Sequence, residues 1–348
     1  MWTFKIDIYY KPIKSDVLVF DYYSLKFAKK LFPKKKLSIF HSRFDGASIY
    51  ILIKTFLKSG FKNFFKNYKI NFFSFVKPKI IYTAIDNHKG FYKLKKIYPH
   101  AKYVSDQNGI RDNKFYNLMK SKKNGEFKYF ADVIFCFGEN EKKRLSKIID
   151  AKIYPLGKTL NNSIAKLKIK KFQFKNLVYL SGWKSNQHRN FSELRSLVQI
   201  ASEMKRSFYF IERPNENFKY LLSKLKKYNY NYVLNKNFKS NKFFQNSIFV
   251  SENSTLLYEM LCKNYRVVFI AREFVRRQNF LNVRLKPKGP FWAYNMNKNG
   301  LTYLINKVNN FNQTEWIQIS NKYSAKFLKF DENNLKKRAI LNNILNRK

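Results

Sequence analysis

The stretch NSIFVSENSTLLYEMLCKNYRVVFIA, residues 246–271, decides the fold class because it forms one complete strand–helix–strand pattern. NSIFV is an apolar run of strand length, the residues from Thr255 have the spacing of an amphipathic helix, and RVVFIA is a second apolar run. Near-continuously apolar strands that alternate with helices are typical of a parallel sheet covered on both faces. We therefore predict a βαβ nucleotide-binding unit here.

The same alternation of strand-like and helix-like segments continues on both sides of this unit. Helix-like segments include Gly46–Lys58, Gly90–Ile97 and Phe191–Lys205. The other apolar runs of strand length lie at residues 16–23, 36–42, 79–86, 101–107, 132–138, 151–157, 176–183, 207–214 and 231–235. The whole chain is therefore predicted to be an α/β protein.

One break in this rhythm suggests the domain organisation. Between residues 159 and 176 the chain is polar and basic, and we interpret this segment as an interdomain linker. Two Rossmann-like domains facing across a cleft are predicted on either side, at 1–165 and 176–320. A helical tail is predicted at 321–348.

The charge of the chain is strongly positive, with 70 Lys and Arg against 22 Asp and Glu and a net charge of +48. Such a charge favours phosphate-bearing partners, either nucleic acid or an anionic membrane surface. The abundance of Lys, Asn, Phe, Ile and Tyr also fits a chain encoded by AT-rich codons, so charge alone does not identify the partner. Because no helix-turn-helix, zinc-finger or RNP motif accompanies the charge, we expect no specific nucleic-acid partner.

The cysteines and the lack of long apolar segments suggest a compartment. Cys136 and Cys262 lie in apolar contexts, as expected of buried hydrophobic residues rather than a disulfide. No Cys/His cluster predicts a metal site, and no run approaches the roughly 18 apolar residues of a membrane span. The N-terminal residues lack the apolar core of a signal peptide. We predict a cytoplasmic protein without metal or cofactor, and peripheral attachment to an anionic inner-membrane surface stays open.

The residues that follow each apolar run are the candidates for ligand binding, because open parallel sheets bind ligands at the carboxyl ends of their strands. After NSIFV, Ser254 and Thr255 begin the helix, where hydroxyls and free N–H groups suit a phosphate. Glu259 lies one turn later on the face of Thr255 and could bind ribose hydroxyls. The alternative is an ordinary helix cap with a surface Glu.

Four short stretches spread through the chain carry a resemblance to a known family. They are IIYTAIDN (80–87), YVSDQNGIR (103–111), ENSTLLYEM (252–260) and GPFW (289–292). With these motifs the chain resembles bacterial surface carbohydrate biosynthesis proteins of the GT-B glycosyltransferase type. The resemblance implies a GT-B-like fold and sugar transfer from a nucleotide-activated donor onto a surface polysaccharide or lipopolysaccharide. It also implies an N-terminal acceptor domain and a C-terminal nucleotide-sugar domain.

Two of these stretches provide acceptor-site candidates in the first domain. Asp86 and Asn87 follow one predicted strand, and Gln107, Asn108 and Arg111 follow the next. The amide side chains could hydrogen-bond a sugar, and Arg111 could hold a carboxylate or phosphate with two hydrogen bonds. The alternative is an ordinary Asn-Gly turn with a solvated arginine.

A catalytic base is predicted in HSRFDGAS (41–48), between a predicted strand and a helix. In an inverting transfer a carboxylate deprotonates the acceptor hydroxyl as the donor leaves. The GT-B resemblance makes Asp45 the first candidate for this role and Asp86 the second, with His41 as an alternative. Asp45 could instead cap the helix, and a retaining reaction would not require such a base.

The remaining donor-site candidates lie in the second domain. By the GT-B resemblance, Ser181 and Gly182 would bring backbone amides to the diphosphate, and Glu212 and Arg213 would line the nucleotide pocket. The loop that holds His188 and Arg189 is a weaker phosphate candidate. The GPFW motif is interpreted either as a cleft loop with a stacking aromatic side chain or as core packing. No DxD motif is present, which agrees with metal-independent GT-B chemistry.

The sequence leaves the reaction and the partners open between several possibilities. The leading one is a glycosyltransferase with a nucleotide-sugar donor and a glycan or lipid-linked glycan acceptor. Alternatives are a polyol-phosphate transferase of GT-B fold with a CDP-activated donor, an inactive transferase, and a non-catalytic basic protein that binds membranes or nucleic acid. Saturable binding of one nucleotide would separate the enzymes from salt-sensitive polyanion binding.

Overall fold

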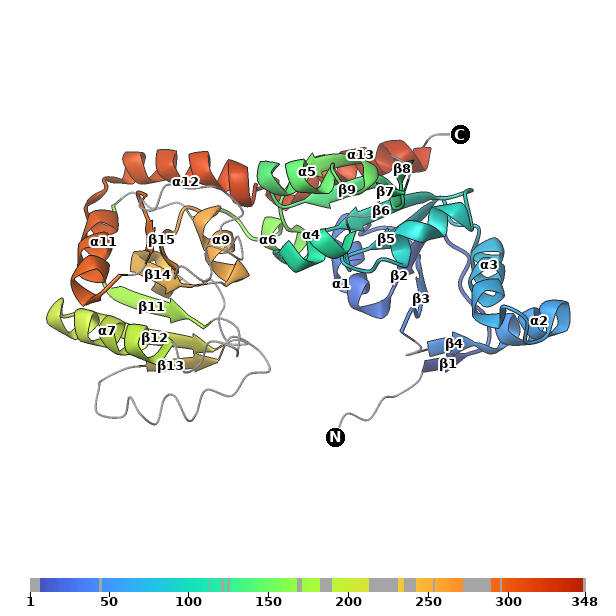
Figure 1. Cartoon of the computed structure of the whole chain (residues 1–348), viewed down its shortest axis with the longest axis horizontal. Helices are drawn as coiled ribbons and strands as arrows, with labels where there is room; N and C mark the ends of the chain where they lie inside the picture. Colours follow the sequence, from blue (N-terminus) through green and yellow to red (C-terminus); the bar gives the residue numbers. More distant parts are fainter. Residues whose placement is uncertain are drawn as a thin grey trace. The chain divides into compact units, whose positions relative to one another are not determined.

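The computed structural model describes most of the chain as two compact units. One unit comprises Met1–Ile164 with Lys329–Lys348, and the other comprises Ala165–Leu328. Each is built on a six-stranded parallel sheet with helices against it (Figure 1), which confirms the predicted α/β class with two parallel sheets and C-terminal helices. The described residues are 7–43, 46–111, 113–119, 122–123, 126–167, 171–181, 190–212, 231–234, 242–252, 254–271, 289–294 and 296–346.

The sheet of the first unit has the order β10–β9–β6–β5–β2–β3, with every neighbouring pair parallel. The central strands are buried along their whole length, which explains why their sequences are apolar without alternation. The strands are β2 (Val17–Phe20), β3 (Leu37–Phe40), β5 (Ile80–Thr83), β6 (Lys102–Asp106), β9 (Phe130–Cys136) and β10 (Asp150–Pro155). Each lies within or close to an apolar run that the sequence predicted.

Helices cover both faces of this sheet. One apolar cluster joins it to α3 (Phe64–Val76) and the other to α1 (Leu25–Leu31) and α13 (Leu335–Asn346), so the chain's last helix packs beside its first. The remaining helical segments are η1 (Tyr22–Ser24), α2 (Ile49–Ser59), η2 (Phe91–Lys96), α4 (Asn113–Met119), α5 (Glu139–Leu145), α6 (Thr159–Asn162) and η6 (Glu332–Asn334). Short two-stranded pairs join β1 (Asp7–Tyr9) to β4 (Gly46–Ser48) and β7 (Lys122–Lys123) to β8 (Glu126–Phe127).

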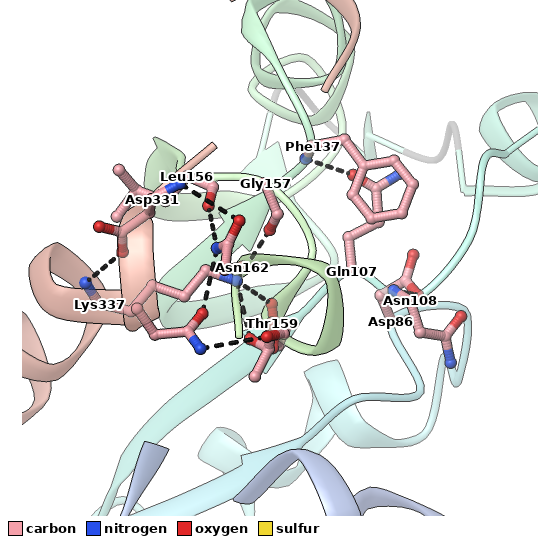
Figure 2. A network of polar contacts seen from close by, with 12 residues as sticks. Asp86, Gln107, Asn108, Phe137, Leu156, Gly157, Thr159, Asn162, Asp331 and Lys337 are labelled. Atoms are coloured by element: carbon pink, nitrogen blue, oxygen red, sulfur yellow. Dashed lines mark hydrogen bonds and ion pairs between the residues drawn. The ribbon is translucent and has the colours of Figure 1, made fainter. Parts of the chain in front are cut away.

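A fully buried ion pair fastens α13 to the sheet (Figure 2). The Lys337 Nζ donates to Asp106 Oδ1 at 2.7 Å, to the carbonyl of Gly157 at 2.8 Å and to Thr159 Oγ1 at 2.9 Å, and neither charged side chain is exposed. Asp106 Oδ2 accepts from Tyr82 and Thr159. All three ammonium donors are therefore used, as a buried lysine requires.

The segment around α6 is part of the first unit's core, so the linker interpretation was wrong for residues 159–162. Thr159, Asn161 and Asn162 are buried. The Asn162 Nδ2 donates to the Leu156 carbonyl at 2.8 Å and to Asn334 Oδ1 at 3.0 Å. The polar side chains that suggested a linker are thus used to bind the C-terminal segment.

The sheet of the second unit has the order β13–β12–β11–β14–β15–β16. Numbered along the chain this is 3-2-1-4-5-6, the order of dinucleotide-binding sheets. The helical segments are α7 (Asn190–Glu203), η5 (Lys242–Asn246), α9 (Thr255–Leu261), α11 (Lys298–Asn310) and α12 (Gln313–Phe327). The strands are β11 (Asn176–Leu180), β12 (Ser207–Glu212), β13 (Asn231–Leu234), β14 (Ser247–Ser251), β15 (Arg266–Ala271) and β16 (Trp292–Tyr294). Helix α11 lies beside α7, and α12 lies beside α9 (Figure 1).

The GPFW motif serves packing, so its interpretation as a cleft loop was wrong. Trp292 begins the edge strand β16 and is 2% exposed. Its ring meets that of Tyr323 edge-on at 5.1 Å. A Cβ on Gly289 would lie 2.1 Å from the indole, so the glycine leaves room for it. The prediction that Cys136 and Cys262 are buried and unpaired is confirmed.

Candidate functional site

The point where strand order reverses in the second sheet lies between β11 and β14. From β11 the chain proceeds to β12 on one side, and it later returns to β14 on the other. The Ser251 hydroxyl at the end of β14 donates to the Leu180 carbonyl of β11 at 2.8 Å. Ser181 follows β11, is buried, and donates its N–H to the Ile211 carbonyl at 3.0 Å. The strand ends are thus held together where sheets of this order bind ligands.

Helix α9 begins at this point. The Ser254 N–H donates to the Ser251 hydroxyl at 3.2 Å, which fixes the start of the helix beside the end of β14. Ser254 has the extended backbone of an N-cap, but its side chain makes no capping hydrogen bond. Thr255 and Glu259 are partly exposed on the helix, whereas its buried residues are Leu257, Tyr258, Met260 and Leu261. The helix begins at Thr255, as the sequence predicted.

Two buried carboxylates lie at the same edge of the second sheet. Glu212 ends β12 and is 8% exposed, and Glu252 follows β14 and is 2% exposed. These strands flank β11 on its two sides. Glu212 was predicted, but Glu252 was missed, although its place directly after an apolar run is the signal used for the others. Four residues predicted in the second unit lie outside the described residues, namely Gly182, His188, Arg189 and Arg213.

In the first unit the structure brings Asp86, Asn108 and Arg111 together. The Arg111 Nε donates to Asp86 Oδ2 at 2.8 Å, and its Nη2 binds Asp86 Oδ1 and, at 2.8 Å, Asn108 Oδ1. The Asn108 N–H donates to Asp86 Oδ1 at 3.3 Å. Burial lowers the pKa of Arg111, but the charge and hydrogen bonds of Asp86, together with Tyr92 and Tyr116, outweigh it, so the guanidinium pKa lies above its ordinary value. Asn87 is exposed beside this cluster.

Gln107 directly precedes Asn108 of this cluster and is 1% exposed. Its Nε2 donates to Glu141 Oε2 at 2.9 Å and to the Gly109 carbonyl at 3.0 Å, and its Oε1 accepts from the Phe137 N–H at 2.8 Å. Tyr116 also donates to Glu141. Burial raises the pKa of Glu141 above its ordinary value, although these hydrogen bonds oppose the rise. In this structure Gln107 holds the loop that carries Arg111.

The predicted base Asp45 lies outside the described residues, but its neighbours are described. His41 is 9% exposed, and its ring stacks on Tyr22 with centroids 6.2 Å apart. A Cβ on Gly46 would lie 2.6 Å from the His41 ring, so a larger residue would displace this histidine. Gly46, which directly follows Asp45, therefore packs closely against the His41 ring.

A carboxylate that the sequence analysis missed, Asp21, follows β2 at the strand-order reversal of the first sheet, between β2 and β5. It is 2% exposed and has a φ of 103°, an unusual conformation for a residue with a side chain. Its oxygens accept from the Tyr23 N–H at 2.8 Å and from the Ser42 hydroxyl at 3.0 Å, and pair with Arg43 Nε at 2.9 Å. Asp21 therefore fixes the segment that leads to Asp45.

Comparisons with known proteins agree with this architecture. Residues 198–345, which include β14, α9 and β15, match the model of a family described as "putative O-antigen biosynthesis protein". No curated protein sequence matches the chain. The resemblance to surface carbohydrate biosynthesis proteins that the four short stretches suggested is thus confirmed.

Several solved structures align with almost the whole chain. The wall teichoic acid polymerase TagF aligns with a TM-score of 0.54 at 10% identity, covering 96% of this chain and 89% of TagF. A glycosyltransferase from Rickettsia africae ESF-5 aligns at 0.51 and 12% identity, covering 97% and 100%. A UDP-GlcNAc 2-epimerase from Neisseria meningitidis aligns at 0.50 and 15% identity, covering 98% and 100%. At such low identities these structural alignments show the fold alone, a GT-B-like fold that transferases share with an epimerase.

Proposed function

We propose that the protein transfers a sugar from a nucleotide-activated donor onto a surface polysaccharide or lipopolysaccharide acceptor. The observation that carries the proposal is the reversal point between β11 and β14, where the SENST segment begins a helix in a sheet of nucleotide-binding order. The O-antigen family match includes this element and supports a glycan as the acceptor.

The donor is proposed to bind along the carboxyl ends of β11, β12 and β14. Ser254 and Thr255 would bind phosphate oxygens through their hydroxyls, and Glu259 would accept hydrogen bonds from the ribose. The Gly182 N–H would contact the diphosphate, because the Ser181 N–H already donates to the Ile211 carbonyl, and Glu212 and Arg213 would lie beside the nucleoside. A diphosphate leaving group would be stabilised by positive charge and oriented N–H groups, without a metal ion.

The acceptor is proposed to bind in the first unit, with Asn87 and Asn108 as ligands of sugar hydroxyls. Asp86 is the weaker of the two base candidates, because its oxygens already accept hydrogen bonds from Arg111 and Asn108. We therefore assign the base to Asp45 and a positioning role to Arg111 and Gln107.

A nucleotide screen tests the donor part of this proposal. Thermal unfolding would be measured with UDP, GDP, CDP, CMP, dTDP and ADP, for the wild type and for Glu259→Ala. A matched control is Glu203→Ala, which removes an exposed carboxylate from α7 of the same unit. A stabilisation by one nucleotide that is lost only in Glu259→Ala supports the donor site. Equal shifts for every polyanion that vanish in moderate salt would contradict it.

A second reaction, transfer of a polyol phosphate from a CDP-activated donor, is favoured by one observation. A teichoic acid polymerase is among the similar structures, and its solved form was soaked with CDPG. Product analysis would separate the two reactions, since polyol-phosphate transfer releases CMP and adds phosphate to the acceptor. Selective stabilisation by CDP together with phosphate-containing product would replace the sugar proposal. Activity unchanged by EDTA is expected in either case.

A further inference from the structure

The hairpin of α2 and α3 exposes an unusual set of apolar side chains. Leu57 is 79% exposed and Phe61 is 84% exposed. By contrast, many of the large apolar residues of the first unit lie in its two buried clusters. The exposed set on this hairpin is Ile49, Ile53, Phe56, Leu57, Phe61 and Phe65. On α2 these residues recur at the spacing of one helix face, and Phe61 and Phe65 continue the surface around the turn. Contiguous exposed apolar surface of this kind marks an interaction site.

The hairpin is rigidly held, so this face cannot turn inward. The opposite face of α2 buries Ile51 and Thr55. The Thr55 hydroxyl accepts from Asn71 Nδ2 of α3 at 3.0 Å, in a buried contact between the two helices. At the base of the hairpin the Ser48 N–H donates to the Tyr68 hydroxyl at 3.0 Å. Figure 1 shows both helices beside β1 and β4, at the periphery of the first unit.

The charged residues of the hairpin itself are all of one sign. Residues 46–85 contain no Asp or Glu. The lysines Lys54, Lys58, Lys62 and Lys66 are all exposed on the hairpin, interleaved with the apolar residues. Apolar aromatic and aliphatic side chains bordered by lysines are typical of helices that lie in the interface of an anionic bilayer. A protein partner would have to supply acidic groups around an apolar groove, whereas an anionic lipid surface provides both chemistries along a plane.

We propose that the α2–α3 hairpin is a membrane-docking surface for an anionic lipid leaflet. Ile53, Leu57 and Phe61 enter the acyl-chain boundary, and the four lysines contact lipid phosphates. The attachment is peripheral, and among the described residues no helix is long and apolar enough to cross a bilayer. The proposal stands on the surface alone and does not depend on sugar transfer.

Vesicle flotation tests the proposal with the full-length protein. Wild type is expected to float with vesicles of phosphatidylcholine and phosphatidylglycerol, and only weakly with phosphatidylcholine alone. At about 0.5 M salt, where screening shortens charge interactions to a few ångströms, part of this binding should remain. The variant Ile53→Ser/Leu57→Ser/Phe61→Ser should lose that salt-resistant binding by at least about 30-fold.

Matched controls separate this surface from the general positive charge. Tyr303→Ser/Leu335→Ser removes two exposed apolar residues elsewhere, and Lys142→Gln/Lys143→Gln/Lys147→Gln removes three exposed lysines from α5 and the turn that follows it. Both should retain wild-type binding in high salt. Equal flotation of the hairpin variant and the wild type would overturn the proposal.

Self-association would overturn the proposal in a different way. If the hairpin covers a second copy of the chain, wild type forms a dimer that the hairpin variant abolishes, and neither binds vesicles. Sedimentation of both proteins in solution measures this. Nucleotide binding by the hairpin variant should equal that of the wild type, so failure of the docking proposal is distinguishable from failure of the proposed function.

Discussion

The carboxyl edges of the two sheets are held together by different chemistry. In the first unit, charged pairs join distant parts of the chain, as Asp86 with Arg111 and Asp106 with Lys337 show. In the second unit, the described contacts at the reversal point join a serine hydroxyl to backbone groups, from Ser251 to Leu180 and Ser254. The first edge is thus fixed by buried ion pairs that are costly to break. The second is fixed by neutral hydrogen bonds between a serine hydroxyl and backbone groups, which are compatible with hydroxyls and amides placed for a ligand.

The largest effect is expected from Lys337→Met. The substitution leaves Asp106 charged and buried without its partner, and should destabilise the first unit by about 4 kcal/mol. Urea unfolding would measure the loss, with hydrogen exchange of the β5 and β6 amides to report on this unit alone. Asp106→Asn/Lys337→Met removes both charges and should recover much of the stability. A double variant as unstable as the single one would contradict an ion-pair origin.

A smaller loss is expected from Arg111→Ala at the same edge. Its side chain is 15% exposed, and its removal leaves Asp86 with only the Asn108 N–H as its described donor. We expect about 3 kcal/mol of destabilisation, because a largely buried carboxylate loses its counter-charge. Thermal unfolding and transfer activity would both be measured. Loss of activity without loss of stability would show direct contact with the acceptor instead of a positioning role.

Ser251→Ala should have a modest effect on stability in the second unit. The hydroxyl makes two hydrogen bonds, and its loss should cost about 1 kcal/mol. Affinity for the selected nucleotide should fall, because the start of α9 loses its fixed position, and calorimetric titration would measure this. Unchanged affinity would indicate that the nucleotide binds away from this point.

The smallest effect concerns acid stability at the opposite edge of the first sheet. Burial raises the pKa of Asp132, but the Tyr103 N–H, Lys95 and Lys102 together lower it more, so its folded pKa lies below its unfolded value near 3.8. The contribution of Asp132 to the free energy of unfolding is therefore fully present well above pH 3.8 and is lost as the pH falls through the folded pKa. Asp132→Asn should flatten the stability profile below about pH 4. A profile identical to that of the wild type would contradict this.

The strands and the α9 site element were predictable because they depend on local sequence. The apolar run at 79–86 contains β5, and 246–253 contains β14. The helix predicted from Gly46 begins instead at Ile49, because Gly46–Ser48 pair with β1. Helix α3 was missed, since apolar residues at most of its positions hide the helical period.

The contacts that organise the first site could not be predicted in this way. Lys337 and Asp106 are separated by 231 positions in sequence, and no local pattern connects them. Asp86 and Arg111 were each predicted as ligand-binding residues, yet they bind each other. A sequence pattern indicates which groups reach a strand end, but only the packing of distant segments decides which groups pair there.

Photochemical crosslinking would show whether a nucleotide binds at the β11–β14 reversal point. A photoreactive analogue of the nucleotide selected by thermal unfolding would be irradiated with the protein and the tryptic peptides mapped. We expect labelling of the peptide from Phe243 to Lys263, which contains β14 and α9, and competition by the free nucleotide. Labelling confined to the first unit, or spread over basic peptides and abolished by salt, would contradict this expectation.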